Sequence, residues 1–404
     1  MKPLASTHSV TALESERRSL LRLLVAATFV VFFQGYMVAP IIPQLSKVLH
    51  TSEQFTGLIV PAYLIPYGIA VLVYGVLADR IGIHRVMLAS LAAFSALSIL
   101  TATAQTAEQL LLFRIATGIG ASGVVPLALA LVGRLYVFEQ RGKALGWLFG
   151  AMAGGMAFGS PLGSLLEPHL SWQGLFLVVG AAGFALLLML FPRRDFIATA
   201  AQPVMGSVRD VVAGYRELLG PSRARRTYAY VLINSIFHSG VFTWLGLYLE
   251  QVHHLDPTGI GLALLGYGVP GFLLGPAIGA VADRWGRARL IPAGLLIGAG
   301  AAALLTLPLP AVAIPLVAIL LSLGYDMTQP LFGGIVTTLG GKRAGQAMGL
   351  NVFTLFVGFG LGSLAFGALL TFGFVTAFAI FAGVELLIGI FAFALFRGER
   401  PKHP

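Results

Sequence analysis

The chain carries ionisable side chains inside long apolar segments, where they could exchange protons or bind polar groups. Asp326 lies in the apolar segment 311–338, His238 in 228–250 and Arg114 in 109–135. An ionisable side chain at the centre of a membrane helix costs about 2.5–3.5 kcal/mol on insertion scales, so such residues usually have a function. A carboxyl group in a low-dielectric site favours its neutral form and can take up and release protons. We therefore predict Asp326 and His238 as proton-coupling residues.

Each of these residues also has a structural interpretation. Asp326 could be a permanently protonated carboxyl group, and His238 could be a hydrogen-bonded structural donor. Arg114 lies about four residues, or roughly 6 Å, inside its segment and could extend to the membrane surface. Glu385 is equally deep in the segment 373–396, and we expect it to pair with an adjacent helix.

A polar stripe on the segment 311–338 indicates a binding cavity. Ser322, Asp326, Gln329 and Gly333 follow the spacing i, i+4, i+7 and i+11, which is one helical face. Asp326 lies about 12 residues, or some 18 Å, into its helix, and Gln34 and His238 reach a similar depth. Tyr63, Tyr67 and Tyr74 also share one face, a pattern that is typical of packing. The predicted cavity residues are Gln34, Asn234, His238, Tyr325, Asp326, Gln329 and Asn351.

The elements that must position these residues are membrane helices. Hydrophobic residues make up 57% of the chain and charged residues 10%, a composition outside the range of soluble domains. Apolar runs of about 20 residues predict twelve spans. They are 20–43, 55–78, 84–105, 109–135, 143–166, 173–192, 228–250, 258–281, 288–308, 311–338, 345–369 and 373–396.

The basic residues predict the orientation of these spans. If both termini are cytoplasmic, all of the 26 basic residues except Lys47 and Arg114 lie on the cytoplasmic side. The net charge of +10 then reflects topology, and no nucleic-acid partner is expected. The chain has no cysteine, which excludes disulfides and thiolate chemistry, and we expect neither a metal site nor a cofactor.

The sequence is an internal duplication. Gly75-Val-Leu-Ala-Asp79-Arg80-Ile-Gly82 and Gly279-Ala-Val-Ala-Asp283-Arg284-Trp-Gly286 share one pattern at an offset of 204 residues, half of the 404-residue chain. Gly120 and Pro126 recur as Gly324 and Pro330 at the same offset. A repeated half with six apolar segments is typical of a transporter built from two bundles.

The duplication defines five regions. We predict a cytoplasmic tail at 1–18, a six-helix bundle at 19–192, a cytoplasmic linker at 193–227, a second six-helix bundle at 228–396 and a cytoplasmic tail at 397–404. Within the linker, 208–219 could form a short helix on the membrane surface. The predicted fold is an all-α integral membrane protein with twelve helices in two pseudo-symmetric bundles.

With these motifs the chain resembles the major facilitator superfamily, and more narrowly its twelve-helix drug and solute proton antiporter (efflux) branch. The resemblance implies that the paired loops latch the cytoplasmic side shut when the cavity faces outward, with Asp79 near Gly345 and Asp283 near Gly142. Solvated loop charges that only set the topology are the alternative. The predicted gating residues are Gly75, Asp79, Arg80, Gly82, Arg85, Gly279, Asp283, Arg284, Gly286 and Arg287.

The resemblance also covers two membrane segments. Arg114 stands where the family has an arginine associated with proton transfer, so the resemblance implies that Arg114 is a third proton-coupling residue. Gly155, Gly159, Pro161 and Gly163 resemble the glycine-proline motif of the family's antiporters, although Ser160 and Ser164 depart from it. Tight packing of small residues would explain these glycines equally well.

These features together predict a secondary active transporter that works by alternating access. The expected activity is proton-coupled efflux of a small amphiphilic drug or metabolite. The alternatives are a sugar or nucleoside uniporter or symporter, and a non-transporting receptor or scaffold. The sequence holds no phosphate-binding G-x-x-x-x-G-K-[ST] loop, H-E-x-x-H or G-x-S-x-G, so no enzymatic activity is expected. The predicted partners are a small-molecule substrate, protons and the lipid bilayer, and we expect a monomer in a bacterial inner membrane.

Overall fold

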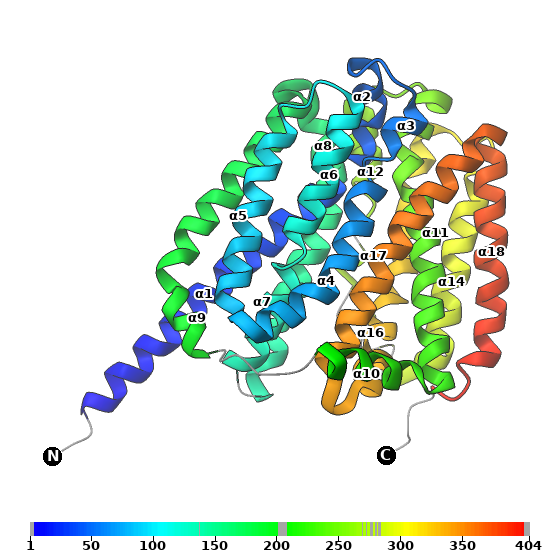
Figure 1. The fold of residues 1–404 in the computed structure, drawn as a ribbon. Helices are drawn as coiled ribbons and strands as arrows, with labels where there is room; N and C mark the ends of the chain where they lie inside the picture. Colours follow the sequence, from blue (N-terminus) through cyan, green and yellow to red (C-terminus); the bar gives the residue numbers. More distant parts are fainter. Residues whose placement is uncertain are drawn as a thin grey trace.

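The computed structural model describes residues 4–136, 138–200, 208–268 and 284–399, together with isolated positions between 270 and 281. Every regular element among these residues is helical (Figure 1). The α-helices are α1 (Leu4–Tyr36), α2 (Ile42–Val48), α3 (Glu53–Gly57), α4 (Pro61–Ile81), α5 (Ile83–Thr101), α6 (Ala107–Ala121), α7 (Val125–Leu135), α8 (Phe138–Leu190), α9 (Arg194–Ala200), α10 (Val208–Leu219), α11 (Ser222–His253), α12 (Pro257–Leu264), α14 (Arg287–Leu304), α15 (Ile314–Asp326), α16 (Gln329–Gly340), α17 (Ala344–Leu369) and α18 (Phe374–Leu395).

The described helices match the predicted membrane spans closely. Among the described residues, ten helical stretches are long and apolar enough to cross a bilayer, and one of them, Lys143–Thr199, has 57 residues. A straight helix of that length would measure about 86 Å, against a hydrocarbon core of about 30 Å. Ser171 has φ 60°, which is non-helical, and this bend separates the predicted spans 143–166 and 173–192. The predicted span 258–281 lies partly outside the described residues.

The two halves of the chain lie side by side in Figure 1, the first coloured from blue to green and the second from green to red. The start of α1 and the end of α18 lie on one side of the molecule, which we call the basic side, together with the start of α5 and the linker helix α10. The loops that contain α2 and α3 lie on the opposite side, which we call the far side. The predicted tail at 1–18 is helical from Leu4 onward, because α1 continues through it.

Several predicted spans are interrupted in the structure. The segment 109–135 divides into α6 and α7 around Ser122–Val124, and 311–338 divides into α15 and α16 around Met327–Thr328. Pro126 and Pro330 lie in the first turn of the second piece in each case, where a missing N–H is tolerated. The segment 55–78 is broken in the same way before Pro61. The prediction of continuous helices was therefore wrong at these three places.

The two halves meet on the far side. Lys47 Nζ lies 2.5 Å from Glu250 Oε1, and Gln251 Nε2 donates to Glu53 Oε2 at 2.6 Å. Ser164 Oγ donates to the carbonyl of Pro257 at 2.7 Å. On the basic side, a β-carbon on Gly75, Gly146 or Gly345 would have nothing within 4 Å. The protein is thus closed on the far side, and open space surrounds these glycines on the basic side.

Candidate functional site

Aromatic rings from both halves form a connected group between the bundles. We call it the central aromatic cage. Its members are Tyr36, Tyr63, Tyr67, His238, Phe242, Tyr267, Tyr325, Phe356 and Phe359. Ring centroids of Tyr67 and Phe356 lie 4.3 Å apart, and those of Tyr36 and Phe359 lie 6.4 Å apart, so the cage spans the interface. Phe242 and Tyr267 are 4.0 Å apart within the second half.

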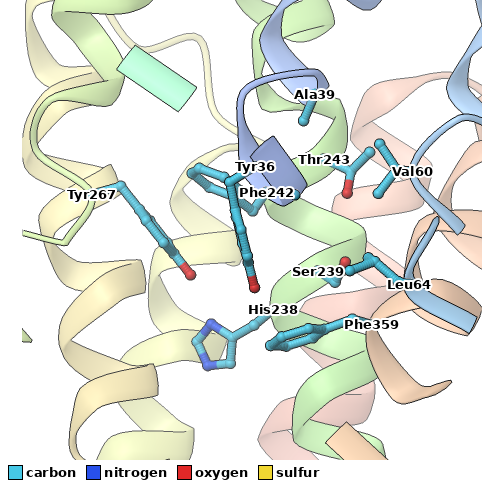
Figure 2. Close-up of a pocket in the computed structure, with 11 residues that line it drawn as sticks. Tyr36, Ala39, Val60, Leu64, His238, Ser239, Phe242, Thr243, Tyr267 and Phe359 are labelled. Atoms are coloured by element: carbon cyan, nitrogen blue, oxygen red, sulfur yellow. The ribbon is translucent and has the colours of Figure 1, made fainter. Parts of the chain in front are cut away.

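A small cavity opens inside this cage. The side chains of Tyr36, His238, Phe242, Tyr267 and Phe359 line it, and Figure 2 shows the two tyrosine hydroxyl groups and the imidazole directed toward one space. The space open to the centre of a water-sized sphere is about 20 Å³, enough for one water molecule. The cavity is therefore nearly filled by its own rings in this conformation, and a larger ligand would have to displace them.

Asp326 follows the cage residue Tyr325 at the end of α15. Its Oδ2 accepts a hydrogen bond from Ser322 Oγ at 2.9 Å, and Ser322 Oγ accepts one from the backbone N–H of Gly268 at 2.9 Å. A β-carbon on Gly271 would stand 2.7 Å from Asp326 Oδ1, so the backbone approaches the carboxylate closely. Gly268 has φ 91°, a left-handed conformation that favours glycine. The carboxyl group thus lies at the break between α15 and α16. This break faces the turn that follows α12 and contains Gly268.

Most of the other predicted cavity residues of the second half lie at or near this break. The imidazole of His238 is buried, its centroid lies 5.2 Å from that of Tyr325, and neither ring nitrogen has a hydrogen-bond partner in the described chain. Asn234 Nδ2 donates to Thr328 Oγ1 at 2.9 Å and so ties α11 to the break. Gln329 Nε2 and Asn351 Oδ1 are buried and unpartnered among the described residues.

Gln34 does not belong to this group. Its Nε2 donates to Ser98 Oγ at 2.6 Å, which directs the side chain to α5 inside the first half. Gln34 is absent from the lining of the central cavity, whereas Tyr36, two residues later, is present. Two residues on a helix are about 200° apart, so Gln34 and Tyr36 lie on nearly opposite faces of α1.

Arg114 is fully buried in the first half. It does not extend to the surface, so that interpretation was wrong. Its Nε donates to the carbonyl of Ile59 at 3.2 Å, and its guanidinium lies 4.2 Å from the Tyr63 ring centroid. The Tyr63 N–H bonds to Val60 at the break before α4, so the Ile59 carbonyl lacks that intrahelical partner. Arg114 therefore stabilises the broken end of α4.

The glycine motif of α8 packs against α1. A β-carbon on Gly155 would stand 2.8 Å from the carbonyl oxygen of Phe29, and one on Gly159 would stand 2.8 Å from that of Phe33. Gly163 packs equally closely on Met37. The structure thus agrees with the packing interpretation of these three glycines. Pro161 lies at the seam between the halves, where its carbonyl oxygen would be 3.0 Å from a β-carbon on Gly261.

Both serines that depart from the family motif make hydrogen bonds that glycine could not. Ser160 Oγ donates to the carbonyl of Tyr36 at 2.8 Å, and Ser164 Oγ donates to that of Pro257. The first bond holds the cage residue Tyr36 in place, and the second joins the two halves.

The paired loop motifs share a backbone conformation. Gly82 has φ 96° and Gly286 has φ 81°, and each lies where one helix ends and the next begins. Asp79 Oδ1 lies 3.5 Å from an Arg134 nitrogen of its own half, and not beside Gly345. Arg80, Arg85 and Arg284 are exposed, whereas Arg287 packs near Gly334. Gly279 and Asp283 lie outside the described residues. The predicted latch is not formed in this structure and stays a prediction.

Two acidic residues have surroundings that the sequence did not reveal. Glu385 is fully buried on α18, and neither carboxyl oxygen has a hydrogen-bond partner in the described chain, so the expected pairing is not observed. Glu399 is buried and bonds to Arg223 at 2.6 and 2.7 Å and to Arg226 at 3.0 Å. Burial alone would raise the pKa of Glu399, but these arginines outweigh it and lower the pKa.

Two helical bundles that meet around a buried, partly polar centre define a membrane transporter. The sequence pattern of the Major Facilitator Superfamily matches residues 24–362 and 253–404. The chain therefore belongs to the Major Facilitator Superfamily.

Relatives and solved structures agree with this assignment. The chain is 29% identical over 273 residues to an uncharacterized MFS-type transporter, YceJ, of Bacillus subtilis (strain 168), covering 67% of this chain and 68% of that one. It is 25% identical to Multidrug resistance protein 1 of the same organism, covering 92% and 94% of the two chains. A crystal structure of the peptide transporter POT shares the fold with a TM-score of 0.76 at 16% identity, covering 94% of each chain.

Proposed function

We propose that this transporter exports small amphiphilic compounds and couples their export to proton entry. The observation that carries the proposal is the central aromatic cage with the carboxyl group of Asp326 next to the cage residue Tyr325. Aromatic faces bind apolar groups and attract cations. A cage with one titratable carboxylate therefore suits amphiphiles with an apolar body and a neutral or positive head.

The conformation fits a loading state for export. The far side is closed by Lys47–Glu250 and Glu53–Gln251, and the basic side holds open space around Gly75 and Gly345. Basic loops are retained on the cytoplasmic side of membranes. In the orientation that we propose, a monomer in a bacterial inner membrane with both termini cytoplasmic, the cage would be loaded from the cytoplasm. The relative named Multidrug resistance protein 1 supports the same direction and substrate class.

Proton coupling would arise from competition at Asp326. A proton or a cationic substrate can neutralise the carboxylate, so each would disfavour binding of the other. The Ser322 bond and the close Gly271 backbone would hold the charged form between these events. One proton moving down about 100 mV supplies about 2.3 kcal/mol. That energy sustains a concentration gradient of about 40-fold.

Inside-out membrane vesicles with an imposed pH gradient would test this proposal. We expect the vesicles to accumulate a fluorescent lipophilic cation such as ethidium, and substrate addition to release protons from the lumen. Asp326→Asn should abolish both proton-driven accumulation and substrate-induced proton release. Glu385→Gln, a second buried carboxyl group away from the cage, is the matched control and should keep both. Undiminished coupling in Asp326→Asn would contradict the mechanism, and no transport of any cation would contradict the function.

A further inference from the structure

A second cavity lies on the outer surface of the protein, at the seam between the halves near the far side. We call it the seam groove. The first half contributes Gly57, Leu58 and Pro61, and the second half contributes Trp244, Ser363 and Ala368. The volume open to the centre of a water-sized sphere is about 300 Å³. A single water needs only about 10–15 Å³ by the same measure, so the seam groove can hold an extended group.

The indole of Trp244 forms a fixed wall of the seam groove. Its Nε1 donates to the carbonyl of Ser363 at 2.9 Å, which sets the plane of the ring. A β-carbon on Gly57 would overlap the ring, and one on Gly367 would stand 2.5 Å from Cζ2. Glycine at both positions is therefore required to admit the indole between the halves. The seam groove is a built feature of the closed far side, because both halves must approach to form it.

The seam groove lies among segments that are apolar enough to span a bilayer, although Gln54 and Thr371 also line it. Its walls belong to the spans Glu53–Ile81, Ser222–His253 and Ala344–Phe372, and Ala368 on its rim is exposed. Leu58, Pro61, Trp244 and Ala368 present apolar surface. In a bilayer, the molecules that meet an open apolar groove on the outer face of spanning segments are lipids.

Ser363 provides an independent sign of a ligand. Ser363 lines the seam groove, and its hydroxyl group is buried and has no hydrogen-bond partner in the described residues. Other serines in these helices behave differently, since Ser95 and Ser235 each donate to the carbonyl four residues earlier. An unpaired hydroxyl in an apolar site is costly, so it usually has a partner. A lipid ester carbonyl would accept its proton.

We propose that the seam groove binds the hydrocarbon tail of a bilayer lipid, with an ester oxygen of that lipid accepting a hydrogen bond from Ser363. The tail contacts Gly57 and Pro61 of one half and Trp244 and Ser363 of the other. Opening of the far side separates these residues, so the tail binds the closed form better. A lipid that binds one conformation preferentially shifts the population toward it. This inference does not depend on the identity of the transported substrate.

Quenching of Trp244 by brominated lipid tails tests the proposal. Phe would replace Trp147, Trp172 and Trp285, leaving Trp244 as the single indole in full-length protein reconstituted in phosphatidylcholine vesicles. We expect the fluorescence of Trp244 to be much weaker in vesicles of brominated lipid than in vesicles of the same lipid without bromine. Ala368→Phe fills the seam groove and should remove at least half of that quenching. Ala365→Phe, at an exposed alanine one turn away on α17 and outside the lining, should leave it unchanged.

Three outcomes would overturn the proposal. Equal quenching in the Ala368→Phe and Ala365→Phe proteins would show that Trp244 senses only the surrounding bilayer. If ethidium relieves the quenching in the single-tryptophan protein without a further substitution, the seam groove binds a transported cation and not a lipid. Ser363→Ala removes only the unpaired hydroxyl and should fold normally, so unchanged quenching and lipid retention in that variant would contradict the hydrogen bond.

Discussion

Lys47 Nζ lies 2.5 Å from Glu250 Oε1 and so joins α2 of the first half to α11 of the second on the far side. Glu53 and Gln251 make a second link beside it at 2.6 Å. Together these residues form a polar clamp between the halves at the side where they meet. Because the Lys47 side chain is 67% exposed, the ion pair adds only modest free energy to far-side closure.

Breaking the clamp should shift the conformational equilibrium. Exposed ion pairs contribute about 0.2–1 kcal/mol, so Lys47→Met should raise the population open on the far side by about 1.4- to 5-fold. The chain has no cysteine, so a single Ser239→Cys in the central cavity reports access to a membrane-impermeant maleimide. We expect faster labelling from the far side in Lys47→Met and no change in Lys47→Arg. Equal rates in all three proteins would show that the clamp does not control closure.

Glu399 should stabilise the second half in a pH-dependent way. Its pKa is lowered by Arg223 and Arg226, so its contribution is fully present above the ordinary value of 4.5 and is lost as pH falls through the lower folded value. The ion pairs of Glu399 with the two arginines are neither fully exposed nor fully buried. Glu399→Gln should therefore lower the free energy of unfolding by about 1–3 kcal/mol at neutral pH. Unfolding temperatures measured across a pH series should show that the difference between Glu399→Gln and the unsubstituted protein becomes smaller in acid.

Glu14→Gln is the matched control for that experiment. Its partner Arg18 lies 3.9 Å away, and both side chains are more than half exposed. We expect a change below about 0.5 kcal/mol at every pH. A constant effect of Glu399→Gln across the acid range would mean that packing, and not charge, explains the role of Glu399.

Close packing of α8 on α1 should depend on Gly159. A larger side chain there meets the Phe33 carbonyl, since even a β-carbon would stand 2.8 Å from that oxygen. Gly159→Leu should destabilise the first half by about 1–3 kcal/mol or prevent folding, as overpacking of a dense interface does. Gly150→Leu on the same helix is the control, because a β-carbon there has nothing within 4 Å. Comparable unfolding temperatures for the two variants would contradict the packing role of the motif.

The sequence predicted the spans well because their length and apolarity follow directly from the thickness of the bilayer. The breaks near Pro126 and Pro330 were missed, although the two prolines were recognised as a repeat. Membrane helices often keep a proline without breaking, so a proline alone does not predict an interruption. The positive φ of Gly268 beside Asp326 could not be predicted either, because it depends on packing against Ala157 of the other half.

The cage was harder to predict than the polar residues around it. Tyr36, Phe242, Tyr267, Phe356 and Phe359 come from four separate segments, and their aromatic spacing is also typical of ordinary packing. Asp326 and His238 could be selected because a charge or an imidazole in an apolar segment is rare. Which face of α1 lies toward the centre depends on its rotation: Tyr36 lines the small cavity, whereas Gln34 bonds within the first half.

Asp79 and Gly345 should approach each other only in the opposite conformation. Here Asp79 bonds to Arg134 of its own half, and the space beside Gly345 is open. Rocking of the halves that opens the far side should close the basic side. A cysteine pair at these two positions can form a disulfide only when their Cα atoms come within about 7 Å. The chain has no other cysteine to compete.

We therefore expect the Asp79→Cys, Gly345→Cys protein to crosslink slowly under mild oxidation. Adding Lys47→Met should make the crosslinking faster, because loss of the far-side clamp raises the population in which the basic side is closed. Arg80→Cys with Gly345→Cys is the matched pair, since the next residue on a helix points about 100° away. Peptide mapping after oxidation measures each rate, and transport recovered on reduction shows that the trapped protein is native. If Lys47→Met leaves the rate unchanged while it opens the far side, the two sides move independently and the latch does not close in alternation with the clamp.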